Sequence, residues 1–219
     1  MSIVAMPRPA AAAAAPAVTD IAAMAAVLMQ SRQTILPKRL AAPGPDGPQL
    51  NMILTAAAGA PDHGQLLPWR FVQVPQAARG QLAEVFGAAL VERDATATAD
   101  QIAQACEKAH RAPRLFLVIV DGTCGDPEVD LFERIVSAGC AVQNMLLMAT
   151  ALGYGSALTS GKALKSAGLR TLFDVADGEH ALCFISMGTV QSRKSARLRP
   201  VPADFVHTLS PAGQIVAGF

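Results

Sequence analysis

Apolar and polar residues follow two different periods along the chain, and each period predicts one kind of element. Short runs rich in β-branched and aromatic residues predict strands at Trp69–Val74, Leu115–Val120 and Leu182–Met187. The run Leu115–Val120 is apolar at every position, which is typical of a strand covered on both faces. A further strand is predicted to end at Ser160, after the glycine-rich turn Gly153–Gly155.

Segments with helical periodicity separate these strands. They are predicted at residues 19–30, 49–58, 76–93, 100–111, 128–152 and 162–169. The segment Glu128–Leu152 has no charged residue after Arg134, which predicts a helix buried all round, in a core or a subunit interface. Strands separated by helices indicate an α/β sandwich rather than a helical bundle or an all-β fold.

Composition narrows the class of protein. The 219 residues are 52% hydrophobic and 16% charged, with a net charge of +1, so the chain as a whole is not disordered. A net charge this close to zero argues against nucleic acid as a partner, because binding to phosphates needs a basic surface. The low fraction of charged residues favours burial of surface between subunits. The Ala/Pro-rich stretch Met1–Val18 lacks the apolar run of a secretory signal and predicts a flexible extension before one domain at 19–219. The apolar segment Ile135–Leu152 is marginal for crossing a bilayer, so no membrane association is expected.

The cysteines point to a reducing compartment. Cys106, Cys124, Cys140 and Cys183 lie far apart and form no CxxC pair, which predicts free thiols and a cytoplasmic protein. Cys106 and His110 are four residues apart, as two metal ligands on one helix face would be. Since no further ligand lies near them in the sequence, a core cysteine and a surface histidine are expected, and no metal.

Several familiar motifs are absent or only mimicked. The segment Gly155–Ala163 resembles a phosphate-binding P-loop, but it has five residues between its glycines and an alanine where the Mg²⁺-binding hydroxyl belongs. No GxGxxG opens a helix after a strand, and no GxSxG elbow is present. NTPase, Rossmann and serine-hydrolase functions therefore have no support.

Two remaining segments carry candidate chemistry. Ser31–Thr34 ends the first helix, where Arg32 suits a phosphate or is simply a solvated cation near the negative end of the helix dipole. The loop Ala60–Phe71 carries His63 and Trp69, either as functional residues or as a surface histidine and a core tryptophan.

These segments resemble the FMN-dependent nitroreductase family, most closely its small YdjA-type branch, and the resemblance covers roughly Ala23 to Val206. The further matching motifs, in chain order, are Lys108–Pro113, Ser137–Met145, Leu152–Gly155, Ser160–Gly161 and Met187–Thr189. The resemblance implies an α+β fold, a three-layer α/β/α sandwich with a mixed, mainly antiparallel sheet, in an intertwined homodimer that binds FMN. It also implies ping-pong hydride transfer through flavin N5, from NADH or NADPH to a small-molecule acceptor such as a nitroaromatic or a quinone. In that chemistry no single side chain is catalytic.

The resemblance also assigns cofactor-binding residues. Those that would contact the FMN phosphate, ribityl chain or ring are Arg32, Gln33, Thr34, Gly59, His63, Leu158, Thr159, Ser160, Arg193 and Lys194, with Gly59 and His63 supplied by the partner subunit. The branch usually has arginine at positions 33 and 59 and Trp-Arg at 158–159, so this chain lacks three cations and one aromatic ring there. Weaker FMN binding is one expectation. The alternatives are a flavin-sequestering dimer with little turnover, an apolar dimeric scaffold without cofactor, or a specialised relative that acts on one defined substrate.

Overall fold

The computed structural model of the protein describes residues 18–193, 195 and 198–218. The predicted extension Met1–Val18 therefore lies outside the described residues except for Val18, which begins helix α1 (Val18–Ser31). The predicted cofactor residue Lys194 also lies outside them.

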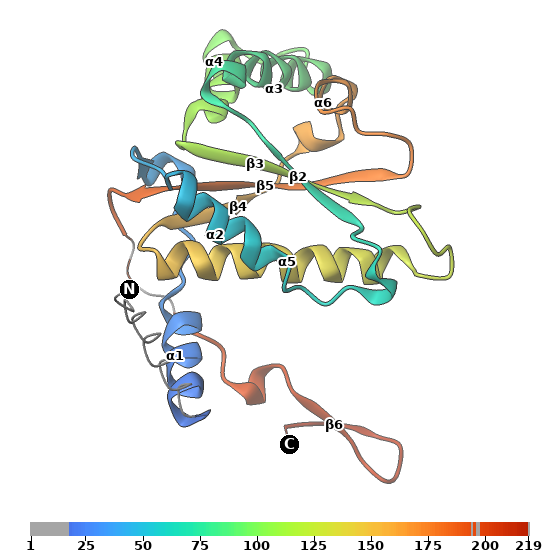
Figure 1. The fold of residues 1–219 in the computed structure, drawn as a ribbon. Coiled ribbons are helices and arrows are strands. Elements are labelled where there is room, and N and C mark those ends of the chain that lie inside the picture. The colour runs from blue at the N-terminus through green and yellow to red at the C-terminus, as the bar shows by residue number, and fades with distance from the viewer. Residues whose placement is uncertain (1–17, 194, 196–197, 219) are drawn as a thin grey trace, which may run out of the picture.

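A five-stranded sheet forms the middle layer (Figure 1), with the order β1-β5-β3-β2 and with β4 also paired to β5. The strands are β1 (Leu40–Ala41), β2 (Trp69–Gln73), β3 (Arg114–Asp121), β4 (Gly155–Thr159) and β5 (Glu179–Val190). All pairings between these strands are antiparallel, and an isolated bridge from Thr34 to Ser156 is parallel. The mixed, mainly antiparallel sheet implied by the family resemblance is confirmed.

Helices cover both faces of the sheet (Figure 1). On one face lie α3 (Arg79–Arg93), α4 (Ala99–Glu107) and α6 (Ala167–Leu172), and on the other lie α2 (Gly47–Ala57) and α5 (Leu131–Ala151). Along β3, Leu115, Leu117 and Ile119 join the core under α3, whereas Phe116 and Val118 join the core under α5. The prediction that this strand is covered on both faces is confirmed.

Side-chain caps set several helix boundaries. Asp46 and Gln49 form a reciprocal capping box at the start of α2, and Thr98 and Gln101 form another at α4. Asp130 caps α5, so this helix begins three residues after the predicted Glu128. No helix within the described ranges is long and apolar enough to span a membrane.

Six short 3-10 helices lie in the described part of the chain. They are η1 (Pro37–Arg39), η2 (His63–Gln65), η3 (Gln76–Ala78), η4 (Lys108–His110), η5 (Lys162–Lys165) and η6 (Pro202–Asp204). The single helix predicted at 162–169 is wrong, because Ser166 has extended backbone angles and caps α6 after η5 has ended. The predicted helices at 76–93 and 100–111 are confirmed, each with a 3-10 turn at one end.

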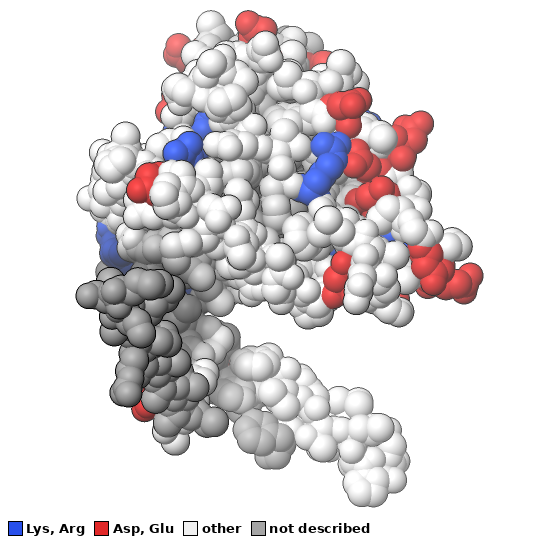
Figure 2. All heavy atoms as spheres, viewed as in Figure 1, with Lys and Arg blue, Asp and Glu red and all other residues white. Residues whose placement is uncertain are grey.

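Two apolar segments extend away from the three layers (Figure 1). One is α1, and the other is the C-terminal hairpin of β6 (His207–Leu209) and β7 (Ile215–Ala217), where the sequence predicted no strand. Gly213, with a φ of +78°, provides the turn between these strands. Residues 205–218 carry no Lys, Arg, Asp or Glu, and Figure 2 shows this arm without charge.

The long helix α5 is buried on one face only within the single chain. Phe132 is 75% exposed and Val136 is 64% exposed, so the core of one chain does not bury this helix all round, and its burial in a subunit interface stays a prediction.

Candidate functional site

The end of β4 is the point where the predicted cofactor residues gather. The link after α1 runs beside this strand: Thr34 bridges to Ser156, and the Ile35 N–H donates to the Ser156 carbonyl at 2.9 Å. In the β4–β5 pairing Ser156 lies opposite Met187 and Thr159 lies opposite Phe184. Since opposed residues project from the same face of a sheet, Ser156 faces the α5 layer and Thr159 faces the α3 layer.

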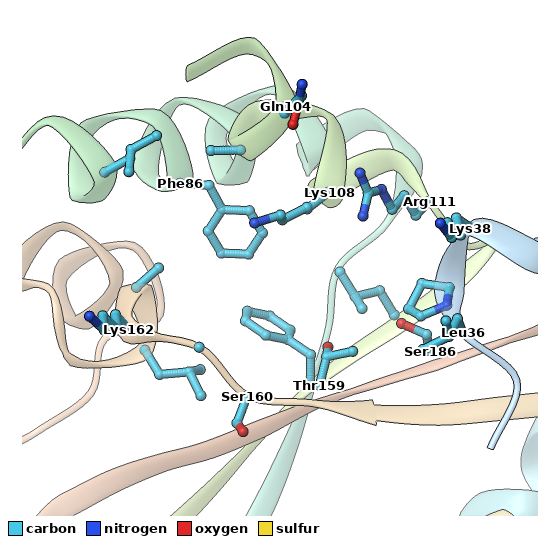
Figure 3. Close-up of a pocket in the computed structure, with 18 of the residues that line it drawn as sticks. Leu36, Lys38, Phe86, Gln104, Lys108, Arg111, Thr159, Ser160, Lys162 and Ser186 are labelled. Atoms are coloured by element: carbon cyan, nitrogen blue, oxygen red, sulfur yellow. The ribbon is translucent and has the colours of Figure 1, made fainter. Parts of the chain in front are cut away.

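A cavity of about 670 Å³ lies on the α3 side of β4. Figure 3 shows it between the helices α3 and α4 and the strands, with Phe86 reaching in from the helices and Thr159 and Ser160 lying along the strand side. The rings of Phe86 and Phe184 meet edge to face with their centroids 5.7 Å apart. The volume lies within the range of cofactor and substrate sites, and the floor is aromatic and aliphatic.

Positive charge surrounds this larger cavity. Its basic lining residues are Lys38, Arg93, Lys108, Arg111 and Lys162. Asp94 is the one acidic lining residue among those that the structure describes. The sequence analysis missed all these cations as site residues, although Lys108 and Arg111 stand in one of the motifs that carried the family resemblance.

Two arginines stabilise the segment that carries this basic rim. Arg111 pairs with Glu107, and its hydrogen bond holds the pKa of the Glu107 carboxyl below its usual value. Behind the rim, the fully buried Arg79 donates to the carbonyl oxygens of Val74, Ala109 and Ala112 at 3.0, 2.6 and 3.2 Å. Arg79 thereby fixes the backbone within η4 and just after it, in the turn that carries Lys108. Burial lowers the pKa of the Arg79 guanidinium.

A smaller cavity of about 220 Å³ lies on the α5 side of β4. It is lined by Arg32, Thr34, Gln143, Leu146, Ser156, Ala157 and Leu158. None of the ion pairs between described residues involves Arg32, so its guanidinium is available to an anion. This cavity also contains a buried hydroxyl, that of Ser156, which has no hydrogen-bond partner in the described part of the chain.

The structure brings only some of the predicted residues together. Arg32, Thr34 and Leu158 line the smaller cavity, and Thr159 and Ser160 line the larger one. Gln33 is half-buried and lines neither cavity.

Gly59, His63 and Arg193 line neither cavity within the chain. His63 lies near the start of α5, where its Nδ1 is 2.8 Å from the Glu133 carboxylate. Gly59 lies two residues beyond the end of α2, and a Cβ built there is 3.8 Å from Asn144 Nδ2, an ordinary contact. Arg193 is exposed in the tail. A cation that the sequence analysis missed is Arg199, which donates to the Arg32 carbonyl at 2.7 Å.

Comparison with known proteins agrees with this geometry. Residues 29–189 match the model of the nitroreductase family. An inferred NAD(P)H nitroreductase of Haemophilus influenzae is 33% identical over 172 residues, which are 77% of this chain and 91% of the relative. The inferred NAD(P)H nitroreductase YdjA of Escherichia coli K12 is 34% identical, with the same 77% and 91% covered.

Solved structures share the fold. A nitroreductase-like family protein from Bacillus cereus has a TM-score of 0.71 at 15% identity, with 83% of this chain and 93% of that chain covered. A nitroreductase with bound FMN from Bacteroides fragilis has a TM-score of 0.63 at 18% identity, with 84% and 98% covered.

Proposed function

The chain belongs to the nitroreductase family, and we propose that it is an FMN-dependent oxidoreductase that transfers hydride from NADH or NADPH to a small electron acceptor such as a nitroaromatic compound or a quinone. The observation that carries this function is the pair of cavities on the two sides of β4. One has an aromatic floor and a basic rim, and the other has an arginine that no described carboxylate neutralises.

The residues present suit the two ends of FMN. A phosphate monoester carries nearly two negative charges and accepts hydrogen bonds, which fits Arg32 and the Thr34 hydroxyl. A flat aromatic ring fits the larger cavity, which Thr159 and Ser160 close on the strand side. The basic rim of this cavity suits an anionic ligand, although positions 33, 59 and 159 of the chain carry no cation.

Each part of the chain has a separate task in the reaction. When bound, FMN would supply the redox chemistry, which is the transfer of hydride from NAD(P)H to the acceptor. Lys38, Lys108 and Lys162 line the larger cavity and would stabilise negative charge on a ring held there. Phe86 and Phe184 exclude water from its floor. No acid or base of the chain is required, which leaves the acceptor to be selected by the shape and charge of the rim.

We also propose that the chain works as a cytoplasmic homodimer. Met24 on α1, Phe132 on α5 and Ile215 in the hairpin are 68%, 75% and 68% exposed, which is apolar surface suited to a second copy. Gly59 and His63 do not line the cavities of their own chain, so in this proposal the partner subunit supplies them, and Gln33, Arg193 and Lys194 complete the cofactor contacts. The four cysteines in the described ranges are free thiols, which suits a reducing compartment.

The test is a visible absorption spectrum of the purified protein with FMN, before and after anaerobic addition of NADH or NADPH. Flavin bands that bleach with either reductant support the oxidoreductase. Bands that persist with both would instead favour the flavin-sequestering alternative, and the absence of flavin binding would refute the proposal.

A pair of variants ties the result to the site. Arg32→Ala removes the unpaired cation and is expected to weaken FMN binding by about 10-fold to 100-fold, the effect of one charge-assisted hydrogen bond. Lys165→Ala removes an exposed cation on η5 that lines neither cavity, and it is expected to leave the FMN dissociation constant unchanged. Equal FMN affinity in the two variants would contradict the role of Arg32.

A further inference from the structure

The larger cavity has to hold the electron acceptor as well as a flavin ring, because hydride passes only between groups in contact. The reacting atoms lie about 3–3.5 Å apart in such a step. Thr159 and Ser160 line the strand side of the cavity, where the ring is proposed to lie, and Phe86 lines the helix side (Figure 3). The space beside α3 and α4 is therefore the part of the cavity that is left for the acceptor.

The cations around this space differ in how far nearby carboxylates neutralise them. Arg111 pairs with Glu107, and Arg93 is followed in the chain by Asp94, which also lines the cavity. The basic lining residues that form no ion pair with any described carboxylate and have no acidic neighbour in the chain are Lys38 and Lys162, and Lys108 forms no such ion pair either. An excess of positive charge therefore remains over an aromatic floor.

Lys108 lies between the other two lysines in the cavity. Figure 3 shows its side chain running inward from η4 on the helix side, with the terminal nitrogen directed toward the middle of the cavity. The amines of Lys38 and Lys162 lie at opposite edges of the same view. Lys108 is also exposed, so its ammonium is accessible to an anion that enters from solvent.

We propose that the acceptor of this oxidoreductase is an aromatic molecule that carries a carboxylate, and that Lys108 binds this carboxylate. The inference rests on the proposed function and names the acceptor class, which that function leaves open. The ring of such a molecule packs against Phe86 and Phe184, whose centroids are 5.7 Å apart. Its carboxylate accepts a charge-assisted hydrogen bond from the ammonium of Lys108. A neutral acceptor of the same shape gains only the aromatic contact.

The charged group of the acceptor takes no part in the redox step. With a nitroaromatic carboxylate, NAD(P)H gives up a hydride and one proton comes from solvent. The nitro group loses one oxygen as water and becomes a nitroso group, and NAD(P)⁺ is released. Both electrons of the hydride end on the nitro group, so the carboxylate is the same before and after. Lys108 is therefore a specificity-determining residue, and its effect is a difference between charged and neutral acceptors.

The experiment measures kcat/KM of the FMN-loaded protein for 4-nitrobenzoate and for 4-nitrobenzamide, a neutral molecule of nearly the same shape. The ratio of the two values cancels any effect of a lysine on the flavin ring, because that effect is common to both acceptors. Lys108→Met is expected to lower the ratio about 5-fold to 10-fold, between the effects of an exposed ion pair and of a charge-assisted hydrogen bond. Lys108→Arg is expected to keep most of the ratio, since it restores the charge. Lys165→Met is the matched control, because Lys165 is exposed and lines neither cavity.

Two results would overturn the inference while the oxidoreductase stands. One is an equal ratio in the wild type and Lys108→Met. The other is a ratio that Lys162→Met lowers as much as Lys108→Met does, because the preference would then follow from the overall charge of the cavity and not from a contact with Lys108.

A different result would mark failure of the proposed function. If the wild type binds no FMN, or reduces neither acceptor, the melting temperature of the protein with each nitro compound decides the inference. A larger rise with 4-nitrobenzoate than with 4-nitrobenzamide, lost in Lys108→Met, supports a carboxylate site at Lys108. Equal rises, or no rise with either compound, refute it.

Discussion

Replacement of Arg79 by methionine tests whether a buried cation without a carboxylate partner holds the wall of the larger cavity. Arg79 is fully buried in α3, and its guanidinium donates to three main-chain carbonyl oxygens. Two of these, Ala109 and Ala112, flank the C-terminal end of η4, and the third, Val74, follows β2. Methionine keeps much of the side-chain volume but leaves all three oxygens without a donor.

The expected cost follows from these three bonds. Each buried carbonyl left unsatisfied lowers the free energy of unfolding by about 1–3 kcal/mol, whereas removal of a desolvated cation offsets part of that loss. Deletion of one partner from a buried charged network destabilises a protein by about 3–5 kcal/mol, which we adopt for Arg79→Met. For a chain of this size the melting temperature is expected to fall by about 6–20 °C. Arg79→Lys is expected to be intermediate, because a single ammonium group cannot reproduce the planar fork that reaches three acceptors.

Urea unfolding followed by circular dichroism measures this loss directly. Arg93→Met is the matched control, since Arg93 is exposed on the same helix and its replacement should change stability by less than about 0.5 kcal/mol. A loss below about 1 kcal/mol for Arg79→Met, or a loss equal to that of the control, would refute the argument that the three carbonyl bonds hold this wall.

Two further predictions test the sheet. Arg70 donates to both carboxylate oxygens of Glu179, at 2.9 and 2.8 Å, and this hydrogen bonding lowers the pKa of Glu179 from its ordinary 4.5. The stabilisation by this pair is therefore present above pH 4.5 and is lost as the pH falls through the lower pKa of the folded state. Glu179→Gln should weaken the loss of stability on acidification, measured as urea midpoints between about pH 5 and pH 3. An equal loss of stability in the wild type and the variant would show that the pair does not cause it. At Gly188 a built Cβ lies 2.7 Å from Pro113 Cδ and 2.9 Å from the Ala41 carbonyl oxygen, so Gly188→Ala should lose about 1–3 kcal/mol in the same assay. Gly80 meets no atom within 4 Å of a built Cβ, and Gly80→Ala should show no such loss.

Elements with strong periodicity could be predicted from the sequence, and very short ones could not. The apolar run at β3 identified a central strand because six consecutive apolar residues need cover on both faces. Strand β1 has two residues and β6 and β7 have three each, so none is long enough to show an alternating pattern. The break between η5 and α6 was missed because Ser166 is a usual helix residue until its backbone is seen to be extended.

The candidate site also contains some residues that sequence motifs could identify and others that only the structure reveals. Arg32, Thr34 and Leu158 could be found because family motifs mark their positions, and the fold brings all three to one cavity. The hydroxyl of Ser156 carried no signal, because a serine in a strand is unremarkable until its burial and its missing partner are known. Lys108 stood in a recognised motif, but its place at the cavity rim depends on the turn that Arg79 holds from another helix.

Substitutions at the floor of the larger cavity are expected to affect stability, and substitutions at its rim are expected to affect charge. Leu115, Leu164 and Phe184 line the cavity and also belong to the core under α3, with exposures of 5%, 8% and 5%. A substitution at the floor therefore changes stability before it changes binding, because a cavity left in a packed core costs about 2–5 kcal/mol. Lys38 and Lys162 are exposed at the rim, where a substitution alters charge at little cost to the core. Affinity for anionic ligands can thus be adjusted through the rim cations without loss of the fold.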